Sequence, residues 1–231
     1  EQAIWDPIIK NNLFVICNTD MAARVTYRTL AGYRDIKNID TSMISTGHYI
    51  KGMHIISDKL VSKATENKDE LVKEIRKSCY WNIDTEDKQN MNFNAIVGNP
   101  PYQLSDKGNA ASDAAAPIYQ HFVGVAKSLE ADYVSIIMPS KWMVGGRTEL
   151  EPFREDMKQD VHIQSLVDIE DDRSVFPAAH NDGGICYFLW NLTKTDESID
   201  YSFYPIEGGV IKGTTLKNNY SKYVIRKNNI L

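Results

Sequence analysis

The sequence has few cysteines and no long apolar segment. Its three cysteines, Cys17, Cys79 and Cys186, are far apart and form no Cys-x-x-Cys pair, so no metal site is expected. Isolated cysteines are typical of a reduced, cytosolic protein. The apolar runs are no longer than strands, which excludes a transmembrane helix of about 20 residues. The first residues have neither the basic start nor the apolar stretch of a signal peptide.

Positive charge is also scarce. The chain of 231 residues has 26 Lys and Arg against 31 Asp and Glu, which gives a formal net charge of −5. Domains that hold DNA by themselves are usually basic, because Lys and Arg contact the phosphates. The balance therefore argues against a chain that grips DNA strongly alone. It is compatible with an enzyme that contacts one nucleotide while another domain holds the duplex.

Short apolar runs rich in β-branched and aromatic residues alternate with amphipathic segments. The runs are nearly continuous, as expected of strands covered on both faces in a parallel sheet. They are residues 13–18, 94–98, 133–138, 163–169 and 185–190, with weaker strand patterns at 53–56 and 79–83 and a strand and turn at 201–209. The predicted helices are residues 21–30, 69–77, 117–129 and 148–158. This order predicts an α/β fold with a mostly parallel, doubly wound sheet.

One strand runs directly into a rigid turn. Residues 94–98 are followed by Asn99-Pro100-Pro101-Tyr102. Proline has a fixed φ and no N–H, so the carbonyls of Asn99 and Pro100 gain no partner from the two proline nitrogens. Polar groups beyond the carboxyl end of a parallel strand lie where open α/β sheets bind ligands. The Asn99 amide oxygen and the Pro100 carbonyl can therefore accept both hydrogens of an exocyclic amino group.

This arrangement predicts chemistry at an aromatic amine. Two acceptors draw the nitrogen lone pair out of conjugation and make the nitrogen more nucleophilic. Tyr102 offers a flat face to the ring, and base–aromatic stacking contributes about 1–3 kcal/mol. No catalytic base is required, because the neutral nitrogen can lose its proton after attack. His121 and His180 are therefore interpreted as surface or structural residues.

The motif also resembles a known signature. Residues 97–102, Val-Gly-Asn-Pro-Pro-Tyr, are similar to that of amino-methyltransferases that use S-adenosylmethionine. Four later stretches resemble, in order and spacing, the adenine-N6 DNA methyltransferases of type II and related type IIG-like restriction–modification systems: residues 117–122, 136–142, 175–177 and 183–190. The resemblance covers residues 92–192. It implies a Rossmann-like methyltransferase fold with one reversed strand, S-adenosylmethionine as the cofactor, and a cytoplasmic enzyme of a bacterium, archaeon or phage.

The resemblance also implies roles for individual residues. Asn99, Pro100, Pro101 and Tyr102 would form the catalytic turn, which holds an adenine flipped out of double-stranded DNA. Phe176 would stack on the other face of the base, whereas a core or rim position is its alternative. Residues 141–142, Lys-Trp, either approach the DNA backbone or are a solvated lysine and a packing tryptophan.

The cofactor residues follow a weaker pattern. In this family a glycine-rich turn after the first strand lets the backbone approach the cofactor closely. The sequence contains no Gly-x-Gly. We therefore expect the glycine-rich turn to lie before Glu1. The strand at 13–18 would then present an acid to the cofactor ribose. Asp20 is the nearest acid, and the N-cap of the next helix is its alternative role. Asp84 is a candidate contact to the cofactor adenine, and Asn99 would also border the cofactor.

These observations define the expected organisation and leave alternatives. Residues 1–209 would form the methyltransferase domain, and residues 210–231 would begin a linker toward a DNA target-recognition domain. A fused or associated endonuclease is a further expected partner. The same turn occurs in methyltransferases that modify a protein glutamine, cytosine N4 or RNA. A catalytically incomplete domain that binds DNA without turnover is the non-enzymatic alternative.

Overall fold

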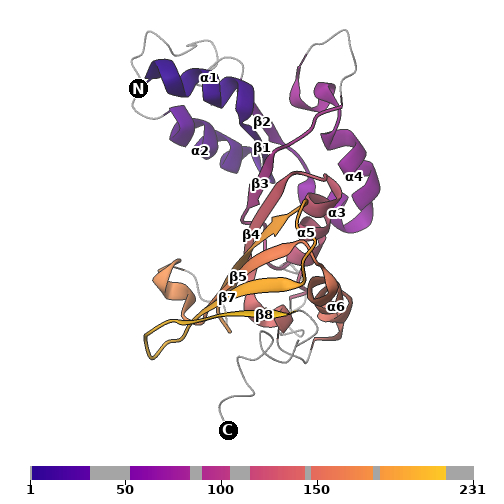
Figure 1. Cartoon of the computed structure of the whole chain (residues 1–231). Helices are drawn as coiled ribbons and strands as arrows, with labels where there is room; N and C mark the ends of the chain where they lie inside the picture. The colour runs from indigo at the N-terminus through magenta and orange to yellow at the C-terminus, as the bar shows by residue number, and fades with distance from the viewer. Residues whose placement is uncertain are drawn as a thin grey trace. The chain divides into compact units, whose positions relative to one another are not determined.

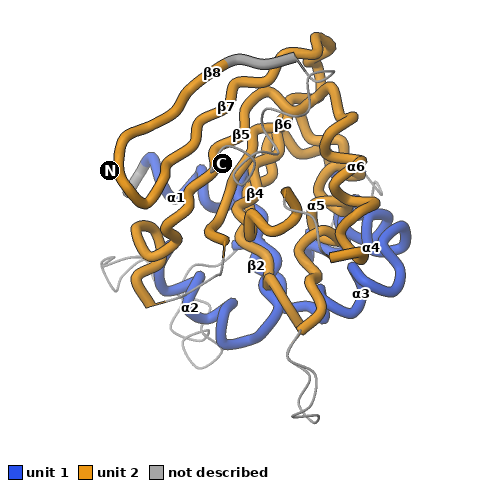
Figure 2. Tube along the Cα trace, turned by 90° about the horizontal axis from the view of Figure 1, so that it is seen from below, with its two compact units in different colours: residues 1–91 blue, residues 92–231 orange. Residues whose placement is uncertain are grey.

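The computed structural model of the chain describes residues 2–31, 53–83, 90–104, 115–143, 147–178 and 183–216. The chain divides into two compact units, unit 1 with residues 1–91 and unit 2 with residues 92–231 (Figure 2). Among the helices in this described part, none has the length and apolarity needed to cross a membrane. The same residues contain no group of three or more His, Cys, Asp or Glu side chains placed to hold a metal ion.

Unit 1 is built on two parallel strands with helices around them (Figure 1). Its elements are α1 (Gln2–Asn12), β1 (Phe14–Cys17), α2 (Asp20–Ala31), β2 (His54–Ser57), α3 (Leu60–Glu66), α4 (Lys68–Ile75) and the 3-10 turn η3 (Ser78–Trp81). A small core of buried apolar residues from α1, α2, β1 and the start of β2 holds it together. The weak strand pattern at 53–56 is thus confirmed as β2.

The second weak strand pattern, at 79–83, is wrong, because this segment forms η3. The side chain of Trp81 is buried, and its indole N–H donates to the carbonyl of Ile75 at 2.7 Å. A buried indole needs such an acceptor. Asn82 then takes a left-handed conformation with φ of 56°, which ends the turn.

Unit 2 contains one six-stranded sheet (Figure 1). Its elements are β3 (Ala95–Gly98), α5 (Tyr119–Ser128), β4 (Tyr133–Pro139), η4 (Ser140–Met143), η5 (Thr148–Leu150), α6 (Glu151–Gln159), β5 (Ile163–Ile169), η6 (Asp172–Ser174), β6 (Ile185–Asn191), β7 (Ser198–Tyr204) and β8 (Ile211–Leu216). The strand order is β3-β4-β6-β5-β7-β8. The predicted α/β class and the strand at 163–169 are therefore confirmed.

The expected mostly parallel sheet with one reversed strand is a mixed sheet instead. The pairs β3–β4 and β5–β7 are parallel, whereas β4–β6, β5–β6 and β7–β8 are antiparallel. Within the described sheet both β6 and β8 are thus reversed. The second reversal arises because the chain turns at Gly208 and Gly209, with φ of 88° and 86°, and pairs back on β7. Such φ values are accessible to glycine at little cost.

The core of unit 2 lies between one face of the sheet and the helices α5 and α6. Helix α5 buries Tyr119, Phe122, Val123 and Ala126, whose spacing places them on one side of the helix. Strand β4 buries every second residue, and Tyr133 on its other face is exposed. The expectation of strands covered on both faces therefore does not hold for β4.

The expected domain boundary after residue 209 falls within the β7–β8 hairpin. Residues 211–216 pair with β7 and continue the sheet. Whether a linker toward another domain follows them stays a prediction.

Candidate active site

The carboxyl ends of β4 and β5 and the start of β6 meet at one edge of the unit 2 sheet. Gly184 precedes β6 with φ of 74°, and a Cβ there would overlap the carbonyl oxygens of Ile169 and Glu170. Only glycine fits this close approach. Its own carbonyl accepts the backbone N–H of Ser140 at 3.0 Å. The Ser140 hydroxyl donates to the buried carboxylate of Asp168 at 2.7 Å, so the ends of these strands are locked together.

The Asn-Pro-Pro-Tyr turn begins where β3 ends, beside β4. The backbone N–H of Ile118 donates to the carbonyl of Tyr102 at 3.1 Å, and that of Leu104 donates to Ala116 at 3.1 Å. The segment that follows the turn is thus held against the residues that lead into α5. Residues 105–114, between these two bonded segments, lie outside the described residues.

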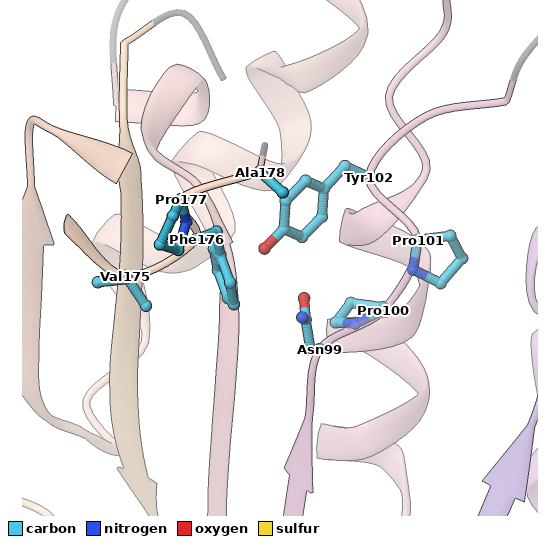
Figure 3. A pocket seen from close by; sticks show the side chains of 8 residues that line it. All are labelled: Asn99, Pro100, Pro101, Tyr102, Val175, Phe176, Pro177 and Ala178. Carbon is cyan, nitrogen blue, oxygen red and sulfur yellow. The ribbon is translucent and has the colours of Figure 1, made fainter. Parts of the chain in front are cut away.

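The Asn-Pro-Pro-Tyr turn and a segment that is distant in the sequence line the same pocket, which has a volume of about 540 Å³. One wall consists of residues 99–102 and the other of residues 175–178 (Figure 3). The structure therefore brings Phe176 opposite the turn, as the resemblance implied. Val175, Pro177 and Ala178 also line the pocket, and nothing in the sequence pattern marked them as lining residues.

A short 3-10 turn supports the second wall. The backbone carbonyl of Asp172 accepts the N–H groups of Val175, at 3.0 Å, and Phe176, at 2.8 Å. The Asp171 side chain caps the turn by accepting the N–H of Arg173 at 3.2 Å. Phe176 is half-buried and does not belong to the core cluster of unit 2. Its position lies outside the core, which leaves a rim position as the alternative to stacking, and its contact with a base stays a prediction.

The acceptors of the first wall are available. Asn99 is exposed, and its side chain has no hydrogen bond to the residues that the structure describes. In the same part of the chain the Pro100 carbonyl accepts no backbone N–H. The Asn99 amide points into the pocket toward the ring of Tyr102 (Figure 3). The Asn99 oxygen can therefore accept a hydrogen from a ligand that enters between the walls, and the Pro100 carbonyl has no backbone donor in the described residues that would compete for it.

Tyr102 contributes its ring to the pocket and keeps its hydroxyl buried. Among the described residues, the hydroxyl has no hydrogen-bond partner. Burial raises the pKa of Tyr102 to about 12, with smaller contributions from the Cys186 thiol and the Asp172 carboxylate. The phenol therefore stays protonated at neutral pH and can donate one hydrogen bond.

Several residues singled out in the sequence lie elsewhere. Trp142 is fully buried and its indole contacts Cys186, so the packing role is confirmed, and Lys141 beside it is half-buried. His121 is on α5, where burial lowers its pKa, and it does not line the pocket. Asp84 and His180 lie outside the described residues.

Asp20 is the first residue of α2 in unit 1 and is exposed. The helix is capped by Thr19, whose hydroxyl accepts the N–H of Ala22 at 3.1 Å. The N-cap alternative for Asp20 is therefore wrong, because Thr19 is the N-cap and Asp20 is the first residue of the helix. Its role in cofactor binding stays a prediction.

Asp58 is an acid that the sequence analysis did not single out. It directly follows β2, and its backbone N–H donates to the carbonyl of Cys17 at the end of β1. Its carboxylate accepts hydrogen bonds from Lys63 at 3.0 Å and from Tyr80 at 2.8 Å. Burial raises the pKa of Asp58, but these hydrogen bonds outweigh burial and hold the pKa below its usual value. The signal in the sequence that could have identified Asp58 is its position as the first acid after the weak strand pattern at residues 53–56.

Comparison with known proteins identifies relatives of the chain. The family model for Eco57I restriction-modification methylases matches residues 11–176. An uncharacterized adenine-specific methylase of Mycoplasma pneumoniae is 38% identical over 100 residues, which are 43% of this chain and 24% of that protein. The chain thus spans about a quarter of the length of this curated relative.

Solved structures are similar at low identity. The methyltransferase subunit of a type I restriction-modification system from Streptococcus thermophilus matches 88% of this chain and 46% of its own, with 13% identity and a TM-score of 0.43. The type IIL enzyme MmeI in complex with DNA matches 87% of this chain and 27% of its own, with 12% identity and a TM-score of 0.46. A DrdV–DNA complex matches 96% of this chain and 29% of its own, with 14% identity and a TM-score of 0.47.

Proposed function

This chain belongs to the Eco57I restriction-modification methylase family, and we propose that it transfers a methyl group from S-adenosylmethionine to the N6 amino group of adenine in DNA. One observation carries the proposal. Asn99, whose side-chain amide has no hydrogen bond to the described residues, and Pro100 line a pocket that has the ring of Tyr102 on one wall and that of Phe176 on the other (Figure 3).

The pocket suits a flipped base. Extruding a base from the duplex costs a few kcal/mol. Stacking on an aromatic side chain contributes about 1–3 kcal/mol for each base, and Tyr102 and Phe176 can sandwich both faces. The volume of about 540 Å³ lies in the range of small-ligand sites. Capture in the pocket thus offsets the cost of extrusion.

The amino group reacts because of how it is held. The Asn99 amide oxygen and the Pro100 carbonyl each accept one N–H, so the lone pair of the nitrogen leaves conjugation with the ring. That lone pair forms the new N–C bond while the bond between the methyl carbon and the donor sulfur breaks and leaves its electron pair on sulfur. One N–H proton then leaves to water. Pro101 fixes the backbone of the turn, so both acceptors keep their positions during the transfer.

S-adenosylmethionine supplies the methyl group on a positively charged sulfur. In unit 1, Asp20 and Asp58 follow the parallel strands β1 and β2, at the end of a sheet where α/β proteins bind ligands. The exposed carboxylate of Asp20 fits a ribose contact. Asp84 remains the proposed contact to the cofactor adenine, and Asn99 remains a proposed neighbour of the cofactor. The sequence has no Gly-x-Gly turn for the methionine part.

Double-stranded DNA is the proposed partner. The net charge of −5 favours a duplex held chiefly by other parts of the full-length protein. A target-recognition domain and a fused or associated endonuclease are the proposed sources of such contacts.

A transfer assay on the full-length protein tests the function. Unmethylated plasmid DNA, RNA and a glutamine-containing peptide are each incubated with tritiated S-adenosylmethionine, and labelled DNA is digested to nucleosides. We expect label in N6-methyladenine and none after Asn99→Ala. Label in the peptide or the RNA, and none in adenine, would refute the proposal. No transfer to any acceptor would favour the catalytically incomplete alternative.

A further inference from the structure

The buried hydroxyl of Tyr102 is not explained by stacking. A phenylalanine at this position would offer the same flat face to a base. The hydroxyl is shielded from solvent and, in the described part of the chain, has no hydrogen-bond partner. Buried polar groups in native proteins are nearly always paired, with protein or with an ordered water. This donor therefore requires an acceptor near the pocket.

Two buried groups act on the phenol through their charge, and both add to the rise of the Tyr102 pKa: Cys186 and Asp172. The Cys186 sulfur already contacts the indole N–H of Trp142 at 3.3 Å, and sulfur is a weak acceptor. Asp172 is 2% exposed and carries a carboxylate, the strongest kind of acceptor in a protein. A carboxylate has two oxygens with about four acceptor positions, so it can accept a further bond beside those it has.

Asp172 also supports the opposite wall. Its backbone carbonyl accepts the N–H of Phe176, the residue that faces the Tyr102 ring across the pocket. The Tyr102 hydroxyl points toward the side of the pocket on which Phe176 lies (Figure 3). A hydrogen-bonded link from Tyr102 to Asp172 would thus connect two walls that the chain supplies from distant segments.

We propose that the Tyr102 hydroxyl donates a hydrogen bond to one ordered water that in turn donates to the Asp172 carboxylate, and that this bridge sets the separation of the Tyr102 and Phe176 rings. Asp172 is then a positioning residue for the captured base. The inference rests on the proposed function, because the separation matters only when a base occupies the pocket.

A double-mutant cycle tests the link in the full-length protein. The variants are Tyr102→Phe, Asp172→Asn and both together, and kcat and KM are measured with unmethylated plasmid DNA and labelled S-adenosylmethionine. We expect Tyr102→Phe to raise KM about three- to tenfold, the usual effect of one hydrogen bond, with kcat changed less than about twofold. Asp172→Asn should raise KM similarly, and the double variant should be no worse than either.

Two matched controls accompany the cycle. Asp171→Asn makes the same change of charge one residue away, at a carboxylate that caps the turn from outside the pocket. Tyr201→Phe removes a hydroxyl that lies 3.4 Å from another buried carboxylate, that of Asp168. We expect neither to change KM. A purely structural effect would lower kcat through loss of active protein and leave KM unchanged.

The outcomes separate this link from the function. KM unchanged by Tyr102→Phe, or losses that multiply in the double variant, would overturn the link while methylation of adenine stands. Absence of transfer to adenine by the wild type overturns the function itself. If Asp172→Asn does not fold by circular dichroism, Tyr102→Phe is compared with Tyr201→Phe, and equal effects of the two on KM overturn the link.

Discussion

Replacing Phe176 by Ala removes one aromatic wall of the pocket and little else. The side chain is half-buried, stands on the short turn after η6, and is not part of the unit 2 core cluster. Its backbone N–H, which is bonded to the Asp172 carbonyl, is kept in the variant. The loss of stacking should therefore appear in base capture, with only a small effect on the free energy of unfolding.

The magnitude follows from the ring alone. Stacking of about 1–3 kcal/mol corresponds to a fall in kcat/KM for DNA of roughly 5- to 150-fold. A buried phenylalanine behaves differently. Phe188, on β6, is 0% exposed and belongs to the core cluster, so Phe188→Ala should lower the free energy of unfolding by about 3–5 kcal/mol. Phe176→Ala should lower it by less than about 1 kcal/mol, because the half-buried side chain is outside the core cluster.

The assay pairs methyl-transfer kinetics with urea unfolding for both variants. The expected result is an inverse pattern, in which Phe176→Ala loses kcat/KM and Phe188→Ala loses stability. A stable Phe176→Ala enzyme with unchanged kcat/KM would refute the role of this ring in base capture. If Phe176→Ala instead lowers the free energy of unfolding as much as Phe188→Ala does, Phe176 has the role of a core residue.

Three further predictions follow from the same geometry. Asn99→Ala should abolish methyl transfer, because one acceptor of the amino group is lost, while calorimetry with S-adenosylmethionine should find its affinity nearly unchanged; retained turnover would contradict the mechanism. Gly184→Ala should unfold at a markedly lower temperature than Gly208→Ala, because a methyl at Gly184 meets backbone carbonyls whereas at Gly208 it meets no atom within 4 Å. The pKa of Asp58 is below its usual value, so its stabilising contribution is present above that usual value and is lost as the pH falls through the lowered one. Unfolding followed from pH 7 to pH 2 should therefore show a smaller loss of stability in Asp58→Asn than in the wild type, and equal losses would contradict this reasoning.

Local patterns predicted most elements of unit 2, and the failures have identifiable causes. The strand Ile163–Ile169 is an apolar run bounded by polar residues, so its limits can be read from the sequence. Strand β8 has no such run, and it forms because a Gly-Gly turn folds it back on β7. Helix α1 was not predicted because Pro7 lies within it, a residue that usually marks a helix start or end.

Only one wall of the candidate site could be predicted from local sequence patterns. Residues 99–102 are contiguous, so the chemistry of the first wall can be reasoned from the turn itself. The second wall depends on how the chain returns after β4, α6 and β5, which no local pattern encodes. The resemblance to a family supplied Phe176. It did not supply Val175, Pro177 or Ala178, nor the hydrogen bond from the Phe176 backbone N–H to the Asp172 carbonyl.

This difference between the walls matches what the proposed reaction requires of each. Methyl transfer requires the amino nitrogen to stay in line with the donor carbon, and misplacement by about 1 Å can cost about a hundredfold in rate. Asn99 and Pro100 accordingly stand on a turn that is fixed by two prolines and by the bond between Ile118 and Tyr102. Stacking tolerates small shifts, and Phe176 follows the single 3-10 turn η6. A wall of that kind keeps its distance only if something ties it to the rigid one, and the buried Tyr102 hydroxyl is placed to do so.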